Sequence, residues 1–292
     1  MQNARTKRNI QRTVRRNRKR KLLAVLFFFL FLPYLCSLLV QDQEAEEKTA
    51  EEFLTGALAA AIPGHYEKET IKAQAVILRS IAKCEGEKTM GYLDVNRRKA
   101  LWGQEFEATE DKFLQAARET AGIVLEKEGE IIIPPYFRIS AGKTRDGDEI
   151  WDDGRFSWCK SVECPYNLEA EEYLQKTCVK KSVFLRRMKQ LGITVEKEPM
   201  ELLLTKDSAG YVLFLTCDGQ YLEGERFREL FSLPSSCFSI SMQKEEVVFT
   251  TRGVGHGLGF DQYGADLLAK SGIDYRELLY TFFDGVTLEK VE

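Results

Sequence analysis

The glycine-rich segment Arg252–Ala265 (RGVGHGLGFDQYGA) holds the densest set of residues that could bind a ligand or react with it. Its glycines permit the close approach of another chain, and His256, Asp261, Gln262 and Tyr263 supply hydrogen-bond donors and acceptors. The spacing differs from the dinucleotide-binding fingerprint, because no strand, GxGxxG turn and helix with an acid about 20 residues further on surround it. The segment is therefore either a binding loop or a structural turn in which His256 satisfies only neighbouring groups.

A second segment, Tyr136–Trp151 (YFRISAGKTRDGDEIW), combines a turn of small residues with polar side chains. Ser140 and Gly142 form the turn, and Thr144 and the carboxylate of Glu149 follow it. No histidine or aspartate relay lies near Ser140 in the sequence, so a serine nucleophile has weak support. The segment is better suited to hydrogen-bonding a ligand than to attacking one.

The third segment, Ile71–Arg79 (IKAQAVILR), places polar groups in an otherwise apolar helix. Gln74 and Arg79 need hydrogen-bond partners if that helix is buried. Two interpretations stay open. The two side chains either contact a ligand or bind only the carbonyl groups of nearby loops.

The pattern of apolar residues predicts helices and strands in irregular order. Helices are expected over 51–61, 67–83, 109–122, 182–190, 224–231, 262–270 and 275–283, the third of them capped by Thr109. Strands are expected over 123–125, 131–133, 202–204, 211–216, 237–241 and 247–250. Because helices and strands do not alternate regularly, we expect an α+β fold, either as one body or as two lobes divided within the charged stretch near 170–200.

The amino-terminal residues differ in composition from the rest of the chain. Residues 1–21 form a basic tail with ten Lys or Arg, and residues 22–40 carry no charge and are long enough to cross a bilayer once. We expect a cytoplasmic tail, a transmembrane anchor over 22–40, a linker over 41–50 and an extracytoplasmic domain over 51–292 in the cell membrane. The exported part is acidic, which argues against nucleic acid as a partner.

Six cysteines lie beyond the predicted anchor. They are Cys84, Cys159, Cys164, Cys178, Cys217 and Cys237. Disulfides can form in an exported region, although a domain of about 250 residues buries enough core without them. Because the chain has only two histidines, a structural zinc site has weak support.

Read together, the three segments resemble the stage II sporulation protein D family, also called the amidase-enhancer family, from about residue 50 to residue 290. The resemblance rests on EEFLTGALAAAIP, IKAQAVILRS, ISAGKTRDGDEIW and RGVGHGLGFDQYGADLLAKSGIDYRELLYTFF. It implies an anchored protein that acts on peptidoglycan at the forespore septum during engulfment. Typical members are lytic transglycosylases that cut glycan strands already stripped of their peptides. The implied partners are the amidase that strips them and a septal membrane protein.

The chain departs from the family pattern at the residue that matters most for cleavage. The family has a catalytic glutamate two residues before the proline that follows the first helix, whereas this chain has Ala61 there. A methyl group cannot transfer a proton, so cleavage would need another acid, with Asp261 and Glu149 as the candidates. Glu67 and Glu69 are expected to stabilise the amino-terminal end of the helix over 67–83, and not to transfer a proton.

The resemblance also bears on cofactors. Some members have a His/Cys cluster, proposed to hold zinc, after the buried helix, but residues 84–108 contain Cys84 and no histidine. We therefore expect no metal and no cofactor.

Three functions stay open at this point, and they differ in whether the chain is an enzyme. The first is a binding protein without cleavage, whose groove grips stripped glycan strands. Its predicted residues are Gln74, Arg79, Ser140, Gly142, Thr144, His256, Gln262 and Tyr263. The second is an active lytic enzyme with a relocated acid. The third is a scaffold that does not touch sugar.

Overall fold

The computed structural model describes residues 50–193 and 202–291. Residues Ala50–Glu292 form one compact unit of helices and strands, which confirms the predicted α+β class. In the two ranges that the structure describes, no helix has both the length and the apolar character needed to span a membrane. The predicted tail, the anchor over 22–40 and nearly all of the linker lie outside the described residues.

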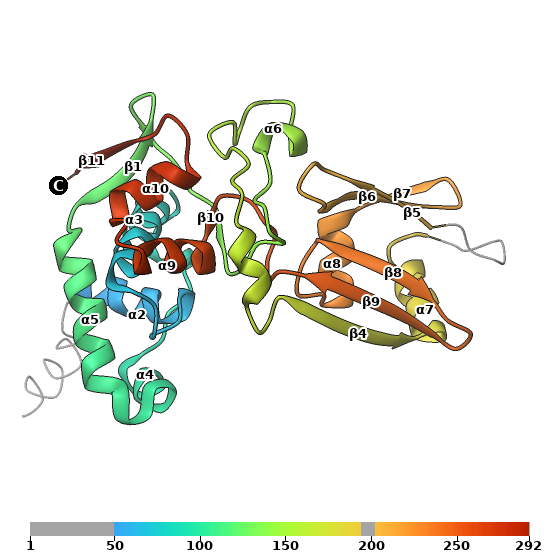
Figure 1. Ribbon diagram of the computed structural model, residues 1–292, viewed down its shortest axis with the longest axis horizontal. Helices are drawn as coiled ribbons and strands as arrows, with labels where there is room; N and C mark the ends of the chain where they lie inside the picture. Colours follow the sequence, from blue (N-terminus) through green and yellow to red (C-terminus); the bar gives the residue numbers. More distant parts are fainter. Residues whose placement is uncertain (1–49, 194–201, 292) are drawn as a thin grey trace, which may run out of the picture. The chain divides into compact units, whose positions relative to one another are not determined.

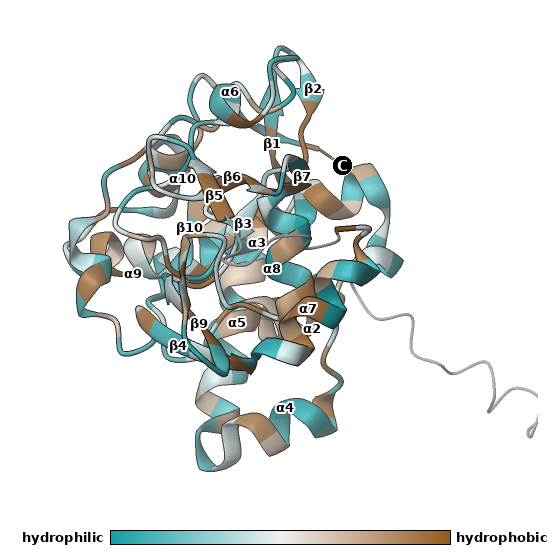
Figure 2. Cartoon of the chain, turned by 90° about the vertical axis from the view of Figure 1, so that its right-hand side faces the viewer, coloured by the Kyte–Doolittle hydropathy of each residue, from teal (hydrophilic) through white to brown (hydrophobic). Residues whose placement is uncertain are grey.

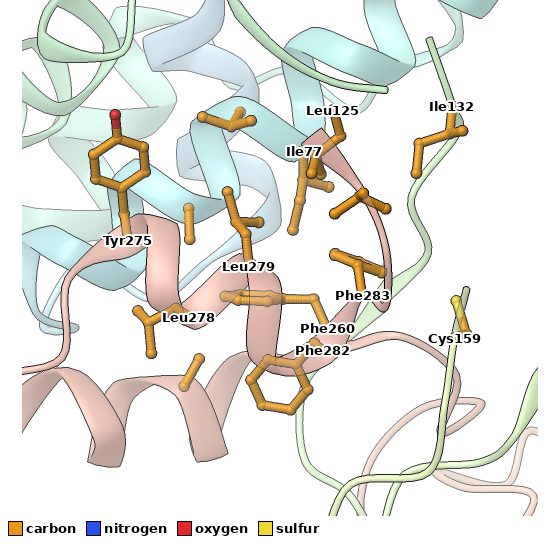
Figure 3. Packing of buried hydrophobic residues seen from close by; sticks show 14 of the residues in the cluster. Ile77, Leu125, Ile132, Cys159, Phe260, Tyr275, Leu278, Leu279, Phe282 and Phe283 are labelled. Atoms are coloured by element: carbon orange, nitrogen blue, oxygen red, sulfur yellow. The ribbon is translucent and has the colours of Figure 1, made fainter. Parts of the chain in front are cut away.

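Five helices pack together around two of the three apolar clusters in the described residues (Figure 1). They are α2 (Ala50–Ala61), α3 (Lys68–Glu85), α5 (Phe106–Glu119), α9 (Gln262–Lys270) and α10 (Tyr275–Phe282). The central helix is α3, in which Ile71, Val76 and Ile77 are fully buried, as its sequence predicted. Figure 3 shows Ile77 facing Leu279 of α10 and Leu125 of β1 (Ile123–Lys127). Helices near the start and near the end of the described residues therefore pack into one hydrophobic core.

Short elements complete this helical part. They are η1 (Glu87–Thr89), α4 (Val95–Trp102), η2 (Gly103–Glu105) and an antiparallel sheet in the order β11-β1-β2, with β2 at Glu130–Ile131 and β11 at Thr287–Lys290. The predicted pairing of 123–125 with 131–133 is thus confirmed in outline. The predicted start of the next helix at Thr109 is wrong, because α5 begins at Phe106 and Thr109 is buried within it.

Two three-stranded antiparallel sheets surround the third apolar cluster. One has the order β4-β9-β8, with β4 at Leu174–Lys180, β9 at Glu246–Arg252 and β8 at Phe238–Met242; the other has the order β5-β6-β7, with β5 at Leu202–Lys206, β6 at Val212–Cys217 and β7 at Gln220–Glu223. Helices α7 (Lys181–Gln190) and α8 (Gly224–Phe231) contribute Phe184 and Phe227, which lie against Phe249 of β9. In Figure 2, α4 and α7 carry both hydrophilic and hydrophobic segments, as expected for helices with one buried face.

The glycine-rich segment and the Tyr136 segment lie side by side. Strand β3 (Tyr136–Phe137) pairs in parallel with β10 (Phe260–Asp261), and isolated bridges join Ile139 to Val254 and Arg145 to Leu258. Helices α6 (Gly147–Ile150) and η3 (Pro165–Glu169) belong to the same region.

This close packing explains one glycine of the segment. A Cβ atom on Gly257 would lie 2.3 Å from the ring of Tyr211, and its φ is +82°. The backbone at residue 257 can therefore pack against the Tyr211 ring only if the residue there is glycine.

Candidate functional site

A cavity of about 560 Å³ opens beside the carboxyl end of α2, and we call it the Ala61 pocket. Its lining comes from four parts of the chain: the end of α2 with the turn after it, the stretch from the end of α4 to the start of α5, strand β3 with Arg138 after it, and the first residue of α9. The residues used below are Ala61, Pro63, Gly64, His65, Trp102, Glu105, Tyr136, Arg138 and Gln262. The position at which the resemblance places the family's acid therefore faces a pocket large enough for a ligand.

The turn after α2 is built so that its tip lines the pocket. Pro63 cannot continue the helix, and Ile62 and Tyr66 are buried on either side of the tip. The N–H of Tyr66 donates to Pro63 O at 3.3 Å and closes the turn. A Cβ atom on Gly64 would lie 2.8 Å from Trp102 Nε1, so the indole ring lies directly against this backbone. The turn and Trp102 thus form one wall.

Gln262 fixes the end of α2. Its Nε2 donates to Ala61 O at 2.9 Å and to Gln74 Oε1 at 3.0 Å, and both glutamines are buried. Ala61 O belongs to the last turn of α2, where carbonyl groups lack helical partners. The structure therefore brings the predicted residues Gln74 and Gln262 together, but it uses them chiefly to position Ala61, and only Gln262 lines the pocket.

Asp261 does not lie in the Ala61 pocket. It is fully buried and caps α9, with Oδ1 accepting from the N–H of Gly264 at 3.2 Å. Its Oδ2 accepts from the N–H of Ser140 at 3.3 Å and from the side-chain amide of Asn167. Burial raises the pKa of Asp261. Because both oxygens serve buried donors, the structure speaks against Asp261 as a relocated acid and places Ser140 in the same buried network.

Glu149 does not line the pocket either. It is exposed on α6, and one of its carboxylate oxygens accepts from the N–H of Ser208 at 2.7 Å. That hydrogen bond lowers the pKa of Glu149. A general acid must hold a proton, so the hydrogen bond works against the proposed role.

Three other predicted residues hold loops in place. The N–H of Val162 donates to Thr144 Oγ1 at 2.8 Å, and the N–H of Cys164 donates to Gly142 O at 2.9 Å. Arg79 donates to Ile123 O at 3.0 Å and to Ala117 O at 3.1 Å, and burial lowers its pKa to about 10. None of the three lines the Ala61 pocket. For Arg79 the structure therefore favours the interpretation in which it binds loop carbonyls.

His256 and Tyr263 support the wall made by β3. His256 Nδ1 accepts from the N–H of Leu258 at 3.2 Å, and Nε2 lies 3.1 Å from Tyr136 O; both hydrogen bonds form together only in the neutral Nε2–H tautomer. The N–H of Tyr263 donates to Arg138 O at 3.0 Å. Both residues therefore act through the backbone of pocket residues.

The role of His256 predicts a pH effect on stability. Burial lowers the pKa of His256 below its usual 6.5, so the unfolded chain binds a proton more readily than the folded chain does. The free energy of unfolding should fall as the pH drops from 7 to 5, by at most about 1.4 kcal/mol per pH unit from this group.

His256→Gln, which retains a donor and an acceptor, should lose this contribution in urea denaturation at pH 5, 6 and 7. His65→Gln, which replaces the exposed second histidine, is the matched control. An unchanged slope in His256→Gln would contradict the account.

Sequence reasoning missed His65, Trp102, Glu105, Tyr136 and Arg138 as pocket residues. Tyr136 and Arg138 stand in a segment already selected, only two to four residues before Ser140. Trp102 and Glu105 carried no signal, because the helix before them was not predicted and their spacing matches no motif. Glu105 is the only acid that lines the described pocket, and it is exposed.

Metal binding has no support from side-chain geometry in the described ranges. Within residues 50–193 and 202–291, no three His, Cys, Asp or Glu side chains gather in a way that could hold an ion.

Comparison with known proteins adds relatives to this geometry. The family model described as SpoIID, Stage II sporulation protein, matches residues 41–126. Stage II sporulation protein D of Bacillus subtilis (strain 168) is 25% identical over 269 residues, which cover 86% of this chain and 77% of that protein. These matches confirm the resemblance to the stage II sporulation protein D family.

Two further relatives extend the comparison. Stage II sporulation protein D of Bacillus amyloliquefaciens is 24% identical over 269 residues, with the same shares of both chains covered. An uncharacterized protein of Brachyspira hyodysenteriae (strain ATCC 49526 / WA1) is 23% identical over 273 residues, which are 89% of this chain and 70% of that protein. Similarity to the stage II sporulation protein D family therefore runs through both the helical part and the sheets.

Proposed function

We propose that this chain binds stripped peptidoglycan glycan strands at the Ala61 pocket and does not cut them. The relatives named stage II sporulation protein D implicate the chain in sporulation. Beyond a role in sporulation, we propose stripped glycan as the ligand, the Ala61 pocket as its binding site and the loss of glycan cleavage. It places the domain outside the cell membrane at the forespore septum, held by the predicted anchor over 22–40.

The observation that carries this proposal is the lining of the Ala61 pocket. Trp102 and Tyr136 offer aromatic rings, while Arg138, His65 and Gln262 offer polar groups beside them. A sugar ring has the matching surfaces, because its C–H groups pack on aromatic rings and its hydroxyl groups accept and donate hydrogen bonds. The wall thus presents polar and apolar surface together, as a sugar ring does.

Cleavage lacks its proton donor in this pocket. Lytic cleavage requires a carboxyl group that protonates the glycosidic oxygen, and general acid–base catalysis is typically worth about 10²–10⁴-fold. At residue 61 the chain has a methyl group. Binding without cleavage follows directly from a pocket that is retained and an acid that is replaced.

Cleavage with another acid is the competing function, and Glu105 favours it. Its carboxylate belongs to the lining of the same pocket. Catalytic glutamates are usually held in buried apolar surroundings, whereas Glu105 is exposed. We therefore rank binding first.

The partners follow from the family resemblance. They are an amidase, which removes the peptides from the glycan strand, and a septal membrane protein, which holds the complex at the septum. Both are part of the proposal as binding partners of this chain.

The test uses fragment 41–292, which contains the compact unit Ala50–Glu292. The fragment is incubated with sacculi whose peptides have been removed, and the bound protein and any anhydro-ended products are measured by sedimentation and mass spectrometry. The proposal expects bound protein and no products. Products that disappear in Glu105→Gln would establish the competing function, and no binding at all would leave only a scaffold.

Trp102→Ala is expected to weaken binding to stripped glycan about tenfold, which corresponds to about 1.4 kcal/mol, because it removes a ring on which the sugar C–H groups pack. The measurement is the same sedimentation assay over a range of protein concentrations. Tyr166→Ala is the matched control, because Tyr166 is an exposed aromatic residue that does not line the pocket. Equal affinity of the two variants would contradict the placement of the ligand. Urea denaturation of Trp102→Ala checks that the fold survives, since Trp102 also packs on Phe113.

A further inference from the structure

A second cavity, of about 440 Å³, is lined by parts of α6, β6 and β7 and by the loops beside them, and we call it the Trp151 pocket. Pro135 lines it, whereas the next residue, Tyr136, lines the Ala61 pocket. Because no residue lines both, the two cavities are separate sites. His256, one of the binding residues predicted from the sequence, lines this cavity, and the proposed function assigns the cavity no role.

Aromatic side chains form much of its wall. Trp151 and Phe156 lie with ring centroids 4.9 Å apart, and Phe214 joins them from β6. Phe214 is 45% exposed, which is unusual for a phenylalanine in a strand. These rings leave an apolar surface of the kind that packs against the methylene groups of a ligand.

The charges around the cavity leave one carboxylate uncompensated. Arg145 pairs with Asp207 at 2.6 Å, and Glu225 pairs with Arg228. Glu223 also lines the cavity, and it has neither an ion pair nor a side-chain hydrogen bond among the described residues. It is the cross-strand neighbour of Phe214 in the β6 and β7 pair. A negative charge thus stands beside an exposed aromatic ring.

We propose that the Trp151 pocket binds the aliphatic ammonium group of a diamino-acid side chain, such as lysine, in a peptide. The methylene chain packs on Trp151 and Phe156, and the ammonium group is held between Glu223 and the ring of its cross-strand neighbour Phe214, away from Arg155, which lies over the Trp151 ring. Aromatic rings attract cations, and a carboxylate supplies the opposite charge. The cavity accommodates one such side chain. The inference does not depend on glycan binding at the Ala61 pocket.

The three tryptophans of the chain allow a direct test on fragment 41–292. Their indole N–H signals are assigned in ¹⁵N spectra with Trp102→Phe, Trp151→Phe and Trp158→Phe. Nα-acetyl-lysine methylamide is then titrated in, with Nα-acetyl-norleucine methylamide as a probe of similar length without the charge. The expected result is a saturable shift of the Trp151 signal with lysine, and binding of norleucine weaker by about tenfold.

A variant pair assigns the effect to Glu223. This side chain forms no capping bond to α8, so Glu223→Gln is expected to fold normally and to remove the preference for lysine over norleucine. Glu246→Gln, which changes an exposed strand glutamate outside the cavity, should keep the preference. The same titration with a lysine-containing tripeptide tests whether a side chain within a peptide enters as the free probe does.

Several results would overturn the inference. Equal shifts with lysine and norleucine would make the pocket an apolar site without charge selectivity, and an unmoved Trp151 signal would exclude binding. A shift confined to Trp102 would assign the probe to the Ala61 pocket. Failure here would leave glycan binding untouched, because that function is reported by Trp102.

Discussion

Replacing Ala61 by glutamate is expected to give this protein glycan-cleaving activity about 10²–10⁴-fold above its own background. The new carboxyl group would stand in the lining of the Ala61 pocket, at the last residue of α2. The carboxyl end of a helix carries partial negative charge, which disfavours an anion there and keeps a carboxyl group protonated at higher pH. The position therefore suits a general acid.

The measurement is the release of anhydro-ended fragments from stripped glycan, followed by mass spectrometry. Ala61→Gln is the matched control, because glutamine has nearly the same shape and cannot donate an acidic proton. Activity in Ala61→Glu and none in Ala61→Gln would establish that the rest of the catalytic pocket is intact. If Ala61→Glu binds glycan and stays inactive, the loss of the acid is not the only change in this pocket.

Asp261→Ala is expected to lower the free energy of unfolding by about 3 kcal/mol, the largest stability loss predicted here. The substitution removes the cap of α9, leaves the buried N–H groups of Ser140 and Gly264 without an acceptor, and leaves the Asn167 amide with only Ser140 Oγ. Burying the carboxylate itself costs free energy, as its raised pKa indicates, and the substitution recovers part of that cost. Two unpaired buried N–H groups and one weakened amide contact outweigh this gain.

Asp274→Ala provides the matched control for this prediction. Asp274 caps α10 in the same way, accepting from the N–H groups of Arg276 at 2.8 Å and Glu277 at 3.0 Å, but it is exposed. Water can replace it, so the expected loss is about 1 kcal/mol. Urea denaturation of both variants gives the comparison. Similar losses of unfolding free energy in the two variants would contradict the structural role of Asp261. Asp261 would then again be a candidate for the general acid of glycan cleavage.

Most of the longer helices and about half of the strands in the described residues could be predicted, because each of these carries a local signal. The apolar pattern of α3 and the Pro63-Gly64 break after α2 need only nearby residues. Strand β4 was missed because its residues alternate between half-buried and exposed, and the surrounding charges are typical of a linker. Pairing with β9 determines it, and that contact links residues about 70 positions apart.

The site could be predicted only in part, for a related reason. The motifs identified the segments around His256 and Ser140, but residues such as Asp261, Thr144 and Arg79 turned out to hold the backbone together. Polar residues in glycine-rich turns serve buried backbone groups as readily as they serve ligands. Trp102 and Glu105 reach the pocket only because α4 and α5 pack against α2. That packing is a tertiary contact, and no local sequence pattern predicts it.

The most direct test of the central claim is a titration of fragment 41–292 with stripped glycan oligomers, followed through the indole N–H signals of its three tryptophans. The account predicts a saturable shift of the Trp102 signal, little change at Trp151 and Trp158, and glycan recovered at its original length. A Trp102 signal that stays in place at saturating glycan would contradict the account.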